Sequence, residues 1–99
     1  MIIVLGSVLA RPETFDELRT LGLQHVHRSR GEPGCISHDV HVHSENPLNL
    51  VFVEKWHDAQ ALAAHFRVRD SIDFVVKARE LSAAPPAIEM FEATVARVG

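Results

Sequence analysis

Strict alternation of apolar and polar residues runs through the middle of the chain and predicts two neighbouring β-strands. In residues 35–43 the side chains that share one face are Ile36, His38, Val40 and Val42. In residues 48–57 the corresponding set is Leu50, Phe52, Glu54 and Trp56. Ser-Glu-Asn-Pro at residues 44–47 is typical of a turn, so the two strands form a hairpin. If their apolar faces coincide, they make one surface with His38 and Glu54 set into it.

The segment before the hairpin predicts a strand followed by a helix. Residues 2–10 are aliphatic and β-branched, as strands are. Residues 12–28 begin with proline and acidic side chains and end near arginines, which suits the helix dipole. The stripe expected to be buried consists of Phe15, Leu18, Gly22 and Val26.

The segment after the hairpin predicts two helical pieces and a last strand. Asp58 can cap a helix that continues through Phe66, and a second piece begins near residue 70 or 71. The second piece is expected to bury Ile72, Val75, Val76 and Leu81. Pro85-Pro86 ends it, and residues 87–98 supply the strand.

The order β-α-β-β-α-β predicts a ferredoxin-like α+β fold, with an antiparallel sheet and the helices on one face. At 99 residues the chain has the length of one domain. Val51 and Val53 lie on the face that the helices leave uncovered. A second copy is the simplest cover for such a face, so we expect a homodimer.

Composition excludes several classes of protein. The chain is 46% hydrophobic and carries a formal charge of −3, which argues against disorder and against binding to nucleic acid. Cys35 is the single cysteine, so neither an intramolecular disulfide nor a cysteine-based zinc site can form. No apolar run approaches the roughly 20 residues of a membrane helix. We therefore expect a cytoplasmic protein with no membrane partner.

Three short motifs together resemble a known family. The chain has Arg-Gly-Glu-Pro-Gly-Cys at residues 30–35, Glu-Lys-Trp at residues 54–56, and His65 nine residues after that tryptophan. In this combination it resembles the antibiotic biosynthesis monooxygenase family over nearly its whole length. The resemblance implies a small dimeric α/β barrel protein.

The resemblance implies a fold more firmly than a reaction. Members of the family oxidise quinols and aromatic polyketides without a cofactor, degrade haem, or isomerise small phosphorylated compounds. Many members have a tyrosine where this chain has His38 and a second histidine where it has Asp70, which indicates a pocket for a different substrate. The haem-degrading members have a tryptophan at the position of His65 and an iron-ligating histidine at that of Val75. Haem degradation is therefore not expected.

Three side chains are candidates for acid–base catalysis. His65 and His38 lie among apolar neighbours, and imidazole can exchange a proton near neutral pH. A packed histidine, satisfied by a backbone carbonyl or by Glu54, is the structural alternative for each. Glu54 is expected to be paired, protonated or linked through water, since a lone buried carboxylate is costly. A structural salt bridge or a hydrogen bond that orients His38 is the alternative to catalysis by Glu54. The candidate substrate-binding walls are Trp56, Phe66 and Phe52.

No metal or other cofactor is expected. His41 and His43 point the same way beside Asp39, but a solvated strand face explains them more simply than a metal site. His25 and His27 are two apart on a helix and diverge, so they cannot chelate together.

The leading hypothesis is a cofactor-independent monooxygenase-like enzyme acting on a small aromatic, quinol-type compound with molecular oxygen. The alternatives are an isomerase or lyase acting on a small carbonyl compound, and a non-catalytic dimer that binds a small ligand.

Overall fold

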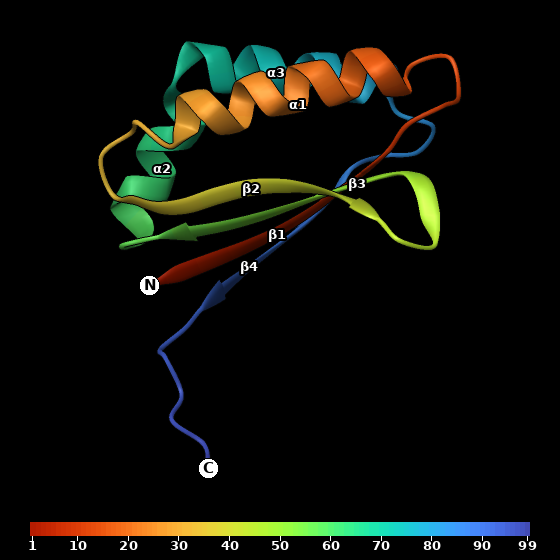
Figure 1. Ribbon diagram of the computed structural model, residues 1–99. Coiled ribbons are helices and arrows are strands. Elements are labelled where there is room, and N and C mark those ends of the chain that lie inside the picture. The colour runs from red at the N-terminus through yellow and green to blue at the C-terminus, as the bar shows by residue number, and fades with distance from the viewer.

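The computed structural model describes residues 1–99 and has the predicted order of elements. They are β1 (Ile2–Leu9), α1 (Phe15–Ser29), β2 (Cys35–His43), β3 (Asn46–Trp56), α2 (Ala59–Arg67), α3 (Arg69–Leu81) and β4 (Ala87–Glu92). The strands form one antiparallel sheet in the order β2-β3-β1-β4, and all three helices lie on one side of it (Figure 1). The ferredoxin-like α+β fold is thus confirmed. None of the helices combines the length and the apolar composition needed to span a membrane.

The hairpin has the register that the alternation predicted. His38 lies opposite Glu54, and Val40 opposite Phe52, so these side chains share the face that meets the helices. Ile36 is an exception, and its predicted place on that face is wrong. An irregularity between Cys35 and Ser37 puts Cys35 opposite Trp56 and leaves Ile36 exposed, because a bulge reverses the side-chain alternation there.

Two predicted boundaries are wrong for reasons that involve distant partners. Helix α1 begins at Phe15 rather than at residue 12, because Thr14 closes a turn with Arg11 and donates to the carbonyl of Leu81. Strand β4 ends at Glu92 rather than at residue 98. Its partner β1 begins at Ile2, which lies opposite Glu92, so no residue of β1 remains to pair with the chain after Glu92.

Helix α3 buries a different stripe from the predicted one. Ser71, Ala78 and Leu81 are buried and Phe74 packs against the core, so α3 turns small residues toward the rest of the protein. Of the side chains predicted to be buried, Leu81 is confirmed, and the exposed ones are Ile72, Val75 and Val76. These three line an open cleft toward β4.

The loop between α1 and β2 is held against α2. Gly34 has φ of 82°, a conformation that glycine adopts without strain, and a Cβ there would overlap the Cβ of Ala61. The Gly34 carbonyl also accepts a 2.8 Å hydrogen bond from the His57 amide. This close approach fixes the position of Glu32 in the same loop relative to α2.

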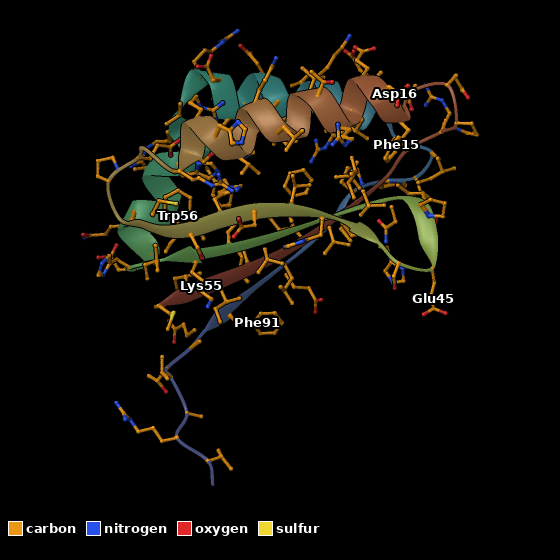
Figure 2. All side chains as sticks on the ribbon, in the orientation of Figure 1. Phe15, Asp16, Glu45, Lys55, Trp56 and Phe91 are labelled. Atoms are coloured by element: carbon orange, nitrogen blue, oxygen red, sulfur yellow. The ribbon has the colours of Figure 1, made fainter.

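The other face of the sheet has no covering element. Figure 2 shows Trp56 on the helix side of the sheet and Phe91 on the opposite side. Phe91 and Leu5 are 45% and 39% exposed on this open face, and Val51 and Val53 are partly exposed beside them. An apolar surface therefore remains on the helix-free side, as the sequence predicted.

Candidate active site

Three buried histidines from three elements meet between the sheet and the helices. They are His25 of α1, His38 of β2 and His65 of α2. Their ring centroids are 5.2 to 5.5 Å apart. The sequence identified His38 and His65 as candidates, but it considered His25 only beside His27. His27 is exposed on the other side of α1, whereas His25 faces the cluster.

His65 forms a dyad with a carboxylate that the sequence analysis missed. Its Nδ1 lies 2.8 Å from Oε1 of Glu32 in the loop before β2. A carboxylate can only accept a hydrogen bond, so Nδ1 of His65 carries the hydrogen and donates. Nε2 of the neutral ring is then left with a free lone pair. Trp56 packs against the same imidazole with ring centroids 4.6 Å apart, which restricts its orientation.

Glu54 is held in place by Trp56 and His38. Nε1 of Trp56 donates a 2.9 Å hydrogen bond to Oε1 of Glu54, and Nε2 of His38 lies 3.2 Å from the same oxygen. Burial raises the pKa of Glu54, but His38, the Trp56 hydrogen bond and His65 together outweigh it, so the pKa is lowered. Glu54 is therefore ionised at neutral pH, and of the three states that the sequence left open, pairing is the one observed.

His25 is a neutral hydrogen-bonding group. Nη2 of Arg28 donates to Nδ1 of His25 at 3.0 Å, because a guanidinium has no acceptor. Nε2 of His25 therefore carries the ring hydrogen. Burial lowers the pKa of His25 to about 2, with further contributions from His38, His65 and Arg28. Its ring stacks on Phe74 with centroids 4.2 Å apart.

A cavity of about 540 Å³ opens beside this cluster, between the sheet and α3. Its polar lining includes His25, Glu54 and His65. Phe52 and Phe66, two of the candidate substrate-binding residues, also line it. Two predicted site residues lie outside the lining. These are Trp56 and His38, both fully buried behind it.

The other polar residues considered in the sequence analysis do not line this cavity. Asp39 pairs with Arg30 at 2.9 Å, and His41 and His43 are exposed. Burial, reinforced by Glu32 and Glu54, raises the pKa of the Cys35 thiol, so it is protonated at neutral pH.

Comparison with known proteins agrees with the fold and the motifs. The family model described as "Antibiotic biosynthesis monooxygenase" matches residues 1–77. A relative named "Uncharacterized protein sll1783", from Synechocystis sp., is 31% identical over 91 residues, covering 92% of this chain and 62% of that protein. The chain thus spans less than two thirds of this relative's length.

A second relative is the "Putative monooxygenase YcnE" of Bacillus subtilis. It is 29% identical over 85 residues, or 86% of this chain and 90% of that protein. Among solved structures, the "putative antibiotic biosynthesis monooxygenase" from Deinococcus radiodurans superimposes with a TM-score of 0.93 at 23% identity. The superposition covers 99% of this chain and 97% of the Deinococcus chain. With more than half of the sequence matched by the family model, the chain belongs to the antibiotic biosynthesis monooxygenase family.

Proposed function

We propose that this protein is a cofactor-independent monooxygenase that oxidises a small aromatic, quinol-type compound in the 540 Å³ cavity. The observation that carries the proposal is the Glu32–His65 dyad at the cavity wall. A histidine whose Nδ1–H is held by a carboxylate presents Nε2 as a general base, and the carboxylate stabilises the imidazolium that forms.

In the proposed reaction, Nε2 of His65 removes a phenolic proton from the substrate. The resulting electron-rich anion supplies all four electrons that reduce molecular oxygen: one oxygen atom enters the ring, the other leaves as water, and the product is a hydroxyquinone. The protein needs only to bind the substrate, deprotonate it and exclude water. The apolar walls, including Phe52 and Phe66, suit a flat aromatic ring.

The other polar groups support this base. The N–H at Nε2 of His25 is a hydrogen-bond donor for a substrate oxygen, since His25 lines the cavity. His38 does not line the cavity, so its proposed role is to hold the carboxylate of Glu54 in position rather than to contact the substrate. Glu54 in turn lies 4.0 Å from Nε2 of His65, so its negative charge attracts the imidazolium that forms during proton transfer.

Oxygen consumption with a panel of quinols and hydroxylated aromatics tests the proposal. At least one compound is expected to be turned over with uptake of one molecule of oxygen per molecule of product, in protein treated with chelator. Turnover of a small carbonyl compound under anaerobic conditions would instead identify an isomerase or lyase that uses the same dyad. Ligand binding without turnover in either assay would indicate a binding protein.

The open apolar face of the sheet predicts a homodimer. Light scattering after size exclusion is expected to give about twice the chain mass of 11.0 kDa at micromolar concentration, because burial of this face in a stable interface favours association. Replacing Leu5 with glutamate places a charge on that face and should produce monomers. The exposed Val42, on the helix-covered face of β2 opposite Leu50, provides a matched control, since Val42→Glu should leave the dimer intact.

A further inference from the structure

Two of the buried histidines approach the same carboxylate oxygen of Glu54. Nε2 of His38 lies 3.2 Å from Oε1 of Glu54, and Nε2 of His65 lies 4.0 Å from the same oxygen. Ligands of a tetrahedral zinc ion, each about 2.1 Å from the metal, are about 3.4 Å from one another. The two observed distances lie on either side of this value, so Oε1 of Glu54 is spaced from each imidazole nitrogen much as two ligands of one ion are.

The hydrogen bonds around the two imidazoles favour a metal ion. Glu32 accepts from Nδ1 of His65, and a carboxylate on the far nitrogen is the usual partner of a metal-bound histidine. His38 is fully buried, yet neither of its ring nitrogens makes a hydrogen bond, because its 3.2 Å contact with Glu54 is not aligned as one. Buried polar atoms nearly always have a hydrogen-bond partner or a ligand, so the unpartnered ring nitrogens of His38 favour a bound ion.

The charge of the cluster also favours a cation. Two carboxylates, Glu32 and Glu54, face a single guanidinium, that of Arg28, which lies 3.8 Å from Glu32. These three charged groups together carry one negative charge. His25 lies within the same group, but Arg28 donates to its Nδ1, so its Nε2 carries a hydrogen and is not a ligand atom.

We propose that this cluster is also a binding site for a divalent first-row transition-metal ion, held by Nε2 of His38, Nε2 of His65 and Oε1 of Glu54. Two histidines and one carboxylate suit zinc, cobalt and iron(II), and the cavity leaves room for water at the open coordination positions. The N–H of His25 is available to a metal-bound water. Since His65 cannot bind a metal ion and accept a proton at Nε2 together, the ion inhibits the acid–base chemistry. This last step alone rests on the proposed function.

Titration of chelator-treated protein with Co²⁺, followed by visible absorbance, tests the site in the absence of substrate. One ion per chain is expected, with the intense bands of a low-coordinate Co²⁺ site that Zn²⁺ displaces. Glu32→Gln keeps every ligand and should weaken binding by about 10- to 100-fold, and Glu54→Gln should weaken it further. The double variant His41→Gln/His43→Gln removes the exposed histidines and should bind as the wild type does.

Two results would overturn the metal site. One is the absence of a stoichiometric Co²⁺ band in folded protein, and the other is its loss in the His41→Gln/His43→Gln control. The variants should be checked by circular dichroism, and Zn²⁺ should raise the melting temperature of the wild type but not of Glu54→Gln.

Inhibition is measured separately. Zn²⁺ is expected to abolish turnover, because the ion occupies Nε2 of His65. Full activity at saturating Zn²⁺ would overturn this inhibition. Metal binding without turnover of any compound would count against the proposed function alone, whereas turnover without metal binding would count against the metal site alone.

Discussion

His65→Gln is expected to lower kcat/KM by about 10²- to 10⁴-fold while changing the free energy of unfolding by less than about 1 kcal/mol. Glutamine roughly preserves the size and hydrogen bonding of histidine, but it cannot accept a proton near neutral pH. The acidic limb of the pH–rate profile, which reports protonation of the base, should disappear. Steady-state kinetics and denaturant unfolding of the same preparation provide both measurements.

Two further variants are needed to interpret the effect of His65→Gln. Glu32→Gln leaves the imidazole in place but removes the carboxylate that holds Nδ1, so a smaller loss of activity is expected with the base still present. His57→Gln replaces an exposed histidine beyond the end of β3 and should behave as the wild type. If His65→Gln instead lost about 1 to 3 kcal/mol of stability and kept its turnover, His65 would be a packing residue.

The stability of the protein is expected to fall in acid because of His25. Its pKa is about 2 in the folded protein against 6.5 for the ordinary side chain. Below pH 6.5 the unfolded chain therefore binds a proton at this position that the folded chain does not, and stability decreases as the pH falls. Between about pH 6 and pH 4.5 this one group should remove about 2 kcal/mol from the free energy of unfolding.

His25→Gln isolates this contribution, because glutamine does not titrate and its amide oxygen can still accept from Arg28. The variant should lose about 2 kcal/mol less than the wild type over the same pH range, measured by urea unfolding. His27→Gln is a matched control on the exposed side of α1 and should keep the wild-type slope. Equal slopes for all three proteins would show that His25 is protonated in the folded state. Because the lowered pKa of Glu54 contributes a loss in acid to each protein, only the difference between the slopes reports on His25.

The exposed side of α3 shows where local pattern and packing diverge. Ile72, Val75 and Val76 are as apolar as a buried stripe, yet the helix turns Ser71, Phe74 and Ala78 inward. Helical periodicity tells which side chains share a face, but the rotation of a helix about its axis depends on what it packs against. Here small residues allow a close approach to α1, and the larger ones are left to line the cavity.

The amino-acid sequence by itself determined the βαββαβ order, the hairpin register and the shared face of His38 and Glu54. These follow from periodicities and turn residues within short segments, which act locally. Its motifs also pointed to the family and to His65. Only the tertiary structure decided that Glu32, Arg28 and His25 join this site, since they come from a loop and a helix whose placement depends on contacts with α2, α3 and the sheet. The dyad and the neutral histidine are products of long-range packing, which no spacing along the chain encodes.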